Sequence, residues 1–309
     1  MRAVDRVDLD LASGERLGIV GESGCGKSTI AMAIMRLLPP SAALDGTVTL
    51  LGTSLTDLDE KAMRAVRGRT VSIIFQDAMS SLHPMLPVGR QIVESVKAHE
   101  RISTRAARQR ALDLLRQVGI PAPELRIRAY PHELSGGMCQ RIMIAMAIAC
   151  EPKLIIADEP TTALDVTVQA QILDLLDDIC KRSSASILLI THDLGVVAGK
   201  TDRVVVMYAG RVVETASTED LFAGARHPYT QGLLRSVPRL DVGIGEDLPT
   251  IFGSVSQIAN PVGCRFAPRC GYAQDICRVQ EPPLEQVEAA HRSACWFSAT
   301  IAERHGLAA

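Results

Sequence analysis

A glycine-rich stretch near the N-terminus, GESGCGKST at residues 21–29, carries the strongest chemical signal in the chain. It has the spacing G-x-x-x-x-G-K-[ST], in which backbone N–H groups surround phosphate oxygens, the lysine reaches the terminal phosphates and the hydroxyl ligates Mg²⁺. The motif requires a strand before it and a helix after it, and the apolar runs ERLGIV and TIAMAIMRLL meet that requirement. We therefore predict a nucleoside triphosphate site with Mg²⁺. Its expected residues are Gly21, Glu22, Ser23, Gly24, Cys25, Gly26, Lys27, Ser28 and Thr29.

Two carboxylates, Asp158 and Glu159, follow the apolar run LIIA at the end of another expected strand. Hydrolysis of a triphosphate needs charge neutralisation and an oriented water, so we assign Asp158 to the Mg²⁺ hydration shell and Glu159 to the attacking water. Taken alone, an Asp-Glu pair at a strand end is more often a solvated loop edge. Its combination with the phosphate loop favours catalysis.

The segments around these motifs alternate between expected strands and helices. We predict strands at ERLGIV, TVTLLG, VSIIFQ, LIIAD and SILLIT, helices at TIAMAIMRLL, IMIAMAIA and VQAQILDLLDDIC, and a hairpin in DRVVVMYAGRVVE that turns at Ala209 and Gly210. The alternation indicates an α/β fold with a parallel sheet and right-handed crossovers. A helical subdomain is expected over about residues 78–150, where helical patterns dominate.

Composition narrows the class of protein. Apolar residues make up 47% of the 309 residues and aromatic residues only 3%, which is typical of an α/β core rather than an all-β one. The formal charge of −2 gives no reason to expect nucleic acid as a partner. The longest apolar run, residues 142–150, is half the roughly 18 residues that span a bilayer, and the N-terminus lacks the apolar stretch of a secretory signal. We expect the chain to lie in a reducing cytosol.

Four further motifs identify a family by resemblance. ELSGGMCQR at residues 133–141 resembles the signature sequence of ABC ATPases, and LIIADEP, TTALD and LLITHD follow in that family's order. The resemblance covers about residues 9–235 and implies a P-loop NTPase fold, the ABC-type nucleotide-binding domain with its helical insert. It also implies that Gln76 binds Mg²⁺ and senses a membrane partner, that Asp165 belongs to the D-loop, and that His192 contacts the γ-phosphate.

The signature residues supply a second phosphate-binding surface. The five are Leu134, Ser135, Gly136, Gly137 and Met138. They open a helix with small residues, and a helix N-terminus of this kind binds anions. Because one fold has only one phosphate loop, we expect this surface to act on ATP held by a facing subunit. The family's head-to-tail dimers sandwich two ATP molecules in this way.

Several stretches resemble one branch of the family. FQDAMSSLHPMLPVGRQIVE, LSGGMCQR and HPYTQGLLRSVP are similar to the ATPase subunits of bacterial oligopeptide, dipeptide and nickel importers. The resemblance implies ATP hydrolysis that powers peptide import, with nickel or another small solute as the alternative cargo. It implies two transmembrane permease subunits, a second ATPase subunit that is a related paralogue, and an extracytoplasmic solute-binding protein. The chain would then be a peripheral protein on the cytoplasmic face of the membrane.

Other P-loop proteins explain the motifs less well. ABC ATPases of DNA repair usually carry a long insertion before the signature, whereas only 107 positions separate Lys27 from Leu134 here. Translation factors of the family carry two ATPase modules, and a P-loop kinase or GTPase would leave the signature and His192 without a role.

The family also places a first strand and an adenine-stacking aromatic residue upstream of the phosphate loop. The twenty residues before Gly21 contain no aromatic residue, so either the strand and the aromatic ring lie further upstream, as we expect, or adenine is held differently.

Four of the eight cysteines gather in a predicted C-terminal extension, residues 238–309, which follows a nucleotide-binding domain at residues 1–237. They are Cys264, Cys270, Cys277 and Cys295. Four thiolates can hold zinc or an iron–sulfur cluster, and gaps of five, six and seventeen residues exceed the roughly two to four of a zinc knuckle. The pattern also resembles the extension of peptide-importer ATPases, which implies a 4Fe–4S cluster. Zinc, or thiols that are merely buried or redox-labile, are the alternatives. A metal brace would fix this Gly- and Pro-rich tail to the core.

Overall fold

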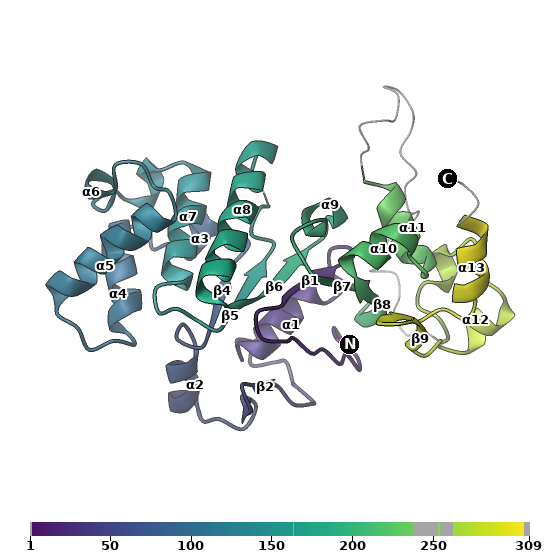
Figure 1. Ribbon diagram of the computed structural model, residues 1–309. Coiled ribbons are helices and arrows are strands. Elements are labelled where there is room, and N and C mark those ends of the chain that lie inside the picture. Colours follow the sequence, from purple (N-terminus) through teal and green to yellow (C-terminus); the bar gives the residue numbers. More distant parts are fainter. Residues whose placement is uncertain (1, 163, 238–252, 254–261, 306–309) are drawn as a thin grey trace. The chain divides into compact units, whose positions relative to one another are not determined.

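The computed structural model describes residues 2–162, 164–237, 253 and 262–305 (Figure 1). The chain divides into two compact units. Unit 1 comprises Met1–Leu11, Arg16–Ile30 and Leu189–Ala309, and unit 2 comprises Ala12–Glu15 and Ala31–Leu188. Helix α1 (Lys27–Ile34) and strand β6 (Ser186–Thr191) each begin in one unit and end in the other.

Unit 1 contains a mixed sheet, whereas the sequence predicts a parallel one. Its strands run in the order β1 (Arg16–Val20), β7 (Arg203–Tyr208), β8 (Arg211–Ser217), β10 (His291–Ser293) and β9 (Glu285–Glu288). The β1 and β7 strands are parallel, and the remaining pairs are antiparallel. The predicted hairpin is confirmed, since Ala209 and Gly210 both have positive φ, as a tight turn with the strands' twist requires.

Short helices complete unit 1 among the described residues. They are α9 (Leu194–Val197), α10 (Thr218–Gly224), α11 (Pro228–Arg235), the 3₁₀ helix η3 (Ala267–Arg269), α12 (Asp275–Val279) and α13 (Ser298–His305). Residues 262–305, called the C-terminal region below, add β9 and β10 to the edge of the sheet at β8. The predicted domain boundary at residue 238 lies outside the described residues.

In unit 2, β4 (Val71–Ile74) pairs in parallel with β5 (Leu154–Asp158). Every residue of β5 is buried. The predicted strand TVTLLG forms only the short β2 (Thr49–Leu50), which turns at Leu51 and Gly52 into β3 (Thr53–Ser54). The helices are α2 (Glu60–Val66), α3 (Ala78–Ser81), α4 (Val88–Lys97), α5 (Thr104–Gln117), α6 (Pro123–Arg126), the 3₁₀ helix η1 (Pro131–Glu133), α7 (Gly136–Ala147) and α8 (Val166–Ser183).

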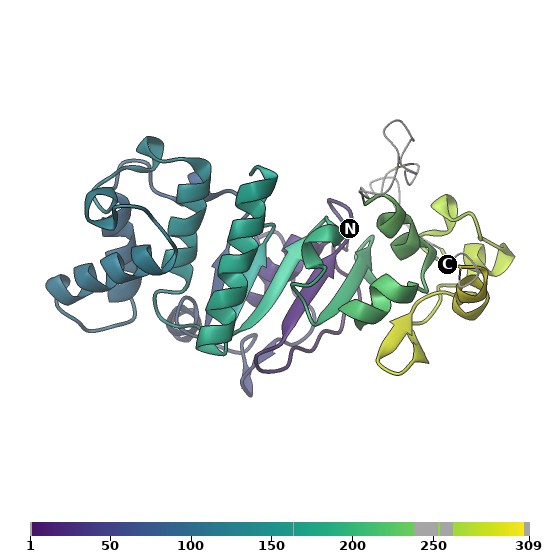
Figure 2. The same ribbon diagram turned by 45° about the horizontal axis from the view of Figure 1, so that its top comes forward.

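Within unit 2, α3, α4 and α5 pack against α7, and α6 packs against α5 (Figure 2). Helix α7 also contacts β4, so the helical group is anchored on a strand of the sheet. The bounds of the predicted helical subdomain stay a prediction. In the part of the chain that the structure describes, no helix combines the length and apolar character that a membrane span requires.

A buried histidine caps helix α11 in unit 1. His227 is 2% exposed, and its Nδ1 accepts a hydrogen bond from the Tyr229 N–H at 3.1 Å. Its own backbone N–H donates to Glu214 Oε2 at 3.1 Å, and Glu214 also bonds His291 of β10 at 2.8 Å. Burial lowers the pKa of His227 to about 4, although the carboxylate of Glu214 and a hydrogen bond with the Ala294 backbone oppose that shift. The cap therefore depends on a neutral imidazole.

We expect His227 to make the protein less stable in mild acid. In the unfolded chain it takes up a proton near its ordinary pKa of 6.5, whereas in the folded chain it stays neutral down to about 4. Stability from this group is thus present above pH 6.5 and is lost as the pH falls toward 4, at about 1.4 kcal/mol per pH unit for one proton. Urea unfolding of the protein and of His227→Asn, which keeps a capping oxygen, at pH 7, 6 and 5 tests this. The variant should show the shallower loss, and equal slopes would contradict the assignment.

Candidate nucleotide-binding site

The phosphate loop has the predicted strand–loop–helix context in unit 1. Strand β1 ends at Val20, and α1 begins at Lys27. The Lys27 side chain is 4% exposed, and its Nζ donates to the carbonyl oxygens of Gly21 at 2.6 Å and Glu22 at 3.0 Å. The ammonium thus lies against the loop's own backbone. Both the lysine and the helix N-terminus bring positive charge to the same turn.

Two of the loop's glycines are required by close contacts. A Cβ atom on Gly21 would lie 2.2 Å from the carbonyl oxygen of Met207, the neighbouring residue on β7. At Gly26, where φ is +104°, a Cβ would lie 2.5 Å from the carbonyl oxygen of Ala3. Gly24 also has a positive φ, but nothing lies within 4 Å of its Cβ position. The backbone of β7 and of the N-terminal segment therefore shapes the loop.

His192 directly follows β6 and lies in the same unit as the phosphate loop. The side chain is exposed. The turn that carries it is fixed by Asp193, whose N–H donates to Thr191 Oγ1 at 3.1 Å and whose carboxylate caps α9 through Gly195. The predicted contact of His192 with a γ-phosphate stays a prediction.

In unit 2, two predicted catalytic residues meet where parallel strands end. Pairing of Ile74 with Ala157 brings the carboxyl ends of β4 and β5 to one edge of the sheet. There Gln76 Nε2 donates to Glu159 Oε2 at 3.0 Å, and Thr162 Oγ1 donates to the same oxygen, also at 3.0 Å. The residue before Glu159, Asp158, is 8% exposed and ends β5. Thr162 belongs to the TTALD stretch, but no local pattern in the sequence marks it as a partner of Glu159.

Glu159 also has an unusual backbone conformation, with φ of +47°. Residues other than glycine rarely adopt a positive φ, because the Cβ crowds the following carbonyl at a cost of about 1–2 kcal/mol. Strain of this kind is concentrated at functional sites. With this backbone conformation, the Glu159 carboxylate accepts the hydrogen bond from Gln76.

The signature opens a helix as predicted. Ser135 precedes α7, and its Oγ accepts a hydrogen bond from the Met138 N–H at 3.3 Å. A Cβ on Gly137 would lie 2.9 Å from Val168 Cγ1 of α8, so a glycine allows the two helices to approach each other. Asp165 caps α8, with its Oδ1 accepting from the Val168 N–H at 3.0 Å. Ser135 and Gly136 are exposed, so this helix N-terminus faces solvent.

The predicted metal centre is wrong. Among residues 2–162, 164–237, 253 and 262–305, no group of three or more His, Cys, Asp or Glu side chains could hold a metal ion. The four cysteines of the C-terminal region are free thiols that share a cavity with aromatic side chains such as Phe266 and Trp296. Burial raises the pKa of Cys264 and Cys270, and that of Cys295 to about 12, so these groups are protonated thiols at neutral pH. Neither the 4Fe–4S cluster nor zinc is supported.

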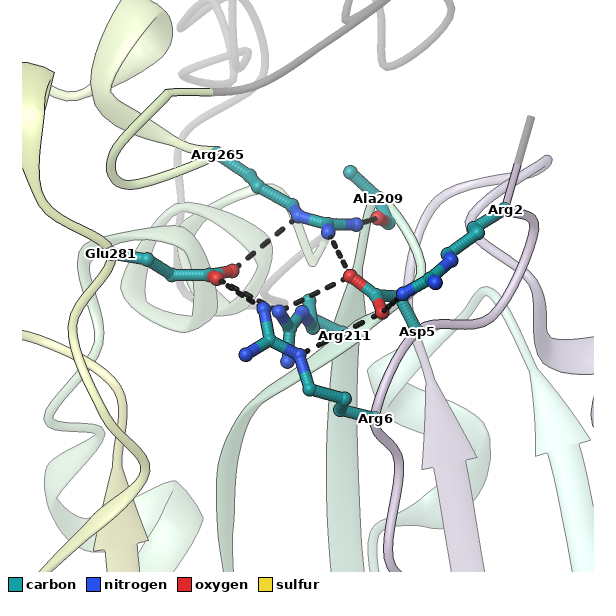
Figure 3. A network of polar contacts seen from close by, with 7 residues as sticks. All are labelled: Arg2, Asp5, Arg6, Ala209, Arg211, Arg265 and Glu281. Carbon is teal, nitrogen blue, oxygen red and sulfur yellow. Dashed lines mark hydrogen bonds and ion pairs between the residues drawn. The ribbon is translucent and has the colours of Figure 1, made fainter. Parts of the chain in front are cut away.

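Ion pairs hold the C-terminal region where a metal was expected (Figure 3). Arg265 Nη2 lies 2.5 Å from Asp5 Oδ2, and Arg265 also donates to the Ala209 carbonyl in the hairpin turn. Arg211 of β8 bridges Asp5 at 3.1 Å and Glu281 at 2.8 Å. Asp5 is 7% exposed, and although burial raises its pKa, hydrogen bonds from Arg2 and Arg265 hold that pKa below its usual value. The network joins the N-terminal segment, the hairpin and the C-terminal region.

Comparison with known proteins agrees with this geometry. Residues 4–162 match the family model for the ABC transporter. The chain belongs to the ABC transporter family. Residues 213–277 of this ABC-type ATPase match a second model, the C-terminal region of oligopeptide/dipeptide transporters.

Curated relatives resemble the ATPase over nearly its whole length. It is 53% identical over 300 residues to a probable peptide ABC transporter ATP-binding protein, y4tR, of Sinorhizobium fredii, covering 96% of this chain and 90% of the relative. It is 51% identical to the oligopeptide transport ATP-binding protein OppD of Bacillus subtilis, covering 96% and 84%. Among solved structures, the dimeric ATP-binding cassette MJ0796 bound to ADP and phosphate gives a TM-score of 0.63 at 30% identity, covering 70% of this chain and 90% of that one.

The close contact at Gly21 predicts different costs for two substitutions in one loop. Gly21→Ala places a methyl group against a backbone oxygen, so we expect a free energy of unfolding lower by about 3 kcal/mol or more. Gly24→Ala meets no atom within 4 Å and should cost only about 1–2 kcal/mol for its positive φ. Urea denaturation of both variants measures the difference. Equal destabilisation would show that the contact with Met207 does not constrain the loop.

Proposed function

We propose that this chain is the ATP-binding and ATP-hydrolysing subunit that powers peptide import through a membrane ABC transporter. The hydrolysis step is supported by one observation above all, the hydrogen bond between Gln76 and Glu159 at the carboxyl edge of β4 and β5. The cargo is supported by the relatives named for peptide transport and by the match of residues 213–277. The layout proposed is a nucleotide-binding domain at residues 1–237 followed by an extension at residues 238–309.

The phosphate loop binds the ATP phosphates in this proposal. Its backbone N–H groups and the α1 N-terminus face the oxygens, and Lys27 turns from its own loop carbonyls to the β and γ phosphates. Ser28, Gln76 and Asp158 would hold Mg²⁺, which neutralises phosphate charge when bound. A hydroxyl, an amide and a carboxylate provide the oxygen donors that this ion prefers.

Glu159 acts on the attacking water. Its carboxylate orients the water and accepts a proton as the water oxygen bonds to the γ-phosphorus, while the bond from that phosphorus to the β–γ bridging oxygen breaks and ADP leaves. Gln76 and Thr162 each donate to the same carboxylate oxygen, so they restrain the orientation of the group that acts on the water. His192 would contact the γ-phosphate.

The assembly proposed is a pair of ATPase subunits on the cytoplasmic face of the membrane. The exposed Ser135 and Gly136 would contact ATP on a second ATPase subunit, a related paralogue, and Asp165 would lie in the same interface. Two transmembrane permease subunits would dock beside Gln76, and an extracytoplasmic solute-binding protein would deliver the peptide. No nucleic acid takes part.

Replacing Glu159 tests the hydrolysis step. In Glu159→Gln, hydrolysis by the assembled ATPase pair should fall by a factor of about 100 or more, because the proton acceptor is lost, while ATP binding is retained. Gel filtration with ATP and Mg²⁺ should then show a longer-lived dimer. Glu219→Gln, which neutralises an exposed carboxylate on α10, is the control and should hydrolyse ATP normally. Undiminished turnover in Glu159→Gln would contradict the assigned role.

A second experiment tests the cargo. The chain should co-purify with a permease pair, and ATP hydrolysis by that complex in lipid vesicles should rise when a peptide-loaded binding protein is added. Stimulation by a nickel-loaded binding protein instead would change the cargo and leave the ATPase role intact.

A further inference from the structure

The second residue of the phosphate loop is bound from outside the loop. Arg269, at the end of η3 in the C-terminal region, makes a bidentate ion pair with Glu22, with Nη1 to Oε2 at 2.8 Å and Nη2 to Oε1 at 2.9 Å. The Arg269 side chain is 7% exposed and that of Glu22 is 27% exposed. Paired hydrogen bonds of this geometry fix the orientation of both groups, and partial burial protects them from solvent screening.

The backbone of Glu22 is bound as well. Its N–H donates to the phenolic oxygen of Tyr229, on α11, at 2.8 Å. Tyr229 is fully buried and packs against Tyr208 at 4.7 Å between ring centroids and against Phe266 of the C-terminal region at 5.4 Å. Glu22 is therefore held at its side chain by Arg269 and at its N–H by an aromatic cluster that includes Phe266.

Arg269 is itself positioned by that cluster. It donates to Tyr208 Oη at 3.3 Å and lies over the Tyr208 ring, with Cζ 5.7 Å from the ring centroid. Burial lowers the pKa of Arg269, but the hydrogen bonds to Glu22 and Tyr208 outweigh this and raise it, so the guanidinium stays charged. The arginine cannot leave Glu22 without giving up these contacts.

The other end of the loop is reached through the N-terminal segment. The Ala3 carbonyl lies against Gly26, and two residues later Asp5 donates its N–H to the Gly210 carbonyl at 2.9 Å. The Asp5 carboxylate is held by Arg265 of the C-terminal region (Figure 3). Arg269 ends η3 and Arg265 lies two residues before that helix, so one short segment is linked to both ends of the phosphate loop.

We propose that Arg269 is a positioning residue for ATP, through which the C-terminal region holds the phosphate loop in its binding conformation. The inference rests on the proposed ATPase function. A loop held in place before ATP arrives loses less conformational freedom on binding, so the ion pair contributes to ATP affinity although Arg269 does not touch the nucleotide. Removing it weakens ATP binding and frees the loop amides.

The test uses the full chain with ATP and Mg²⁺. In Arg269→Met, the dissociation constant for ATP should rise about tenfold, as loss of a contact network of this kind produces. Hydrogen exchange of the amides of residues 21–26, measured without nucleotide, should become faster. Arg269→Lys keeps a charge but cannot bind both carboxylate oxygens, so its affinity should lie between those of the protein and Arg269→Met. In the assembled transporter, KM for ATP should rise while kcat stays within about twofold.

Two further variants separate positioning from general stability. Glu22→Gln should reproduce the effect of Arg269→Met, and the double variant should be no weaker than either single one, because both changes break the same pair. Glu288→Gln is the matched control. It removes the ion pair between Arg226 and β9, another link from the C-terminal region to the rest of unit 1, and it should leave ATP affinity and loop exchange unchanged.

The outcomes distinguish this inference from the proposed function. If the unmodified chain fails to bind ATP, the proposed function fails, while the exchange rates of residues 21–26 still decide whether Arg269 holds the loop. If the chain binds ATP but Arg269→Lys and Glu22→Gln both keep its affinity and its loop exchange, the positioning role is overturned. An equal loss of affinity in Glu288→Gln would also overturn it, by showing a general effect of destabilising the C-terminal region.

Discussion

The close approach of the phosphate loop to the strand beside it is the constraint on which the nucleotide site depends. Because β1 and β7 are parallel neighbours, the chain leaves β1 directly against the Met207 carbonyl, and only a glycine fits at position 21. From there the loop must curl back within a few residues to begin α1, and this places the buried Lys27 ammonium against the carbonyls of Gly21 and Glu22. Strand pairing, loop shape and lysine position are thus consequences of one packing arrangement.

Backbone strain and hydrogen bonding occur together at Glu159, the proposed catalytic glutamate. The positive φ of Glu159 is unfavourable for a residue with a side chain, yet the turn brings its carboxylate within 3.0 Å of both Gln76 and Thr162. A carboxylate restrained by two donors loses little further freedom when it orients a water. The arrangement therefore restrains the Glu159 carboxylate, although the backbone conformation at this residue is unfavourable.

The C-terminal region is attached to unit 1 by charge and aromatic packing. The side chains of Arg265 and Arg269 are largely buried, and each meets a carboxylate, Asp5 or Glu22, that is itself partly buried. Phe266 lies between them in sequence and contacts Tyr208 and Tyr229. Buried ion pairs are sensitive to the loss of one partner, because the remaining charge is left without compensation. Ion pairs of this kind therefore fix the place at which the C-terminal region attaches to the rest of unit 1.

The features that the sequence determined by itself are those that depend on neighbours along the chain. The strand–loop–helix around residues 21–29, the hairpin turn at Ala209 and Gly210, and the helix that opens at the signature residues follow from local spacing and backbone preference, and all are present. The strand predicted over TVTLLG is shorter than expected. Only Thr49–Leu50 forms β2, because the chain turns at Leu51 and Gly52.

Which side chains meet was decided only by the tertiary structure. Gln76 and Glu159 are 83 residues apart and Glu22 and Arg269 are 247 apart, so no local pattern could reveal either pair. The tail cysteines led to a wrong metal prediction for the same reason: four thiols close in sequence bind a metal only if their sulfur atoms converge as thiolates. Burial instead raises the pKa of Cys264, Cys270 and Cys295, which keeps these thiols protonated, and ion pairs with distant residues hold that part of the chain. Local sequence sets backbone conformation, whereas topology sets the distances on which binding chemistry depends.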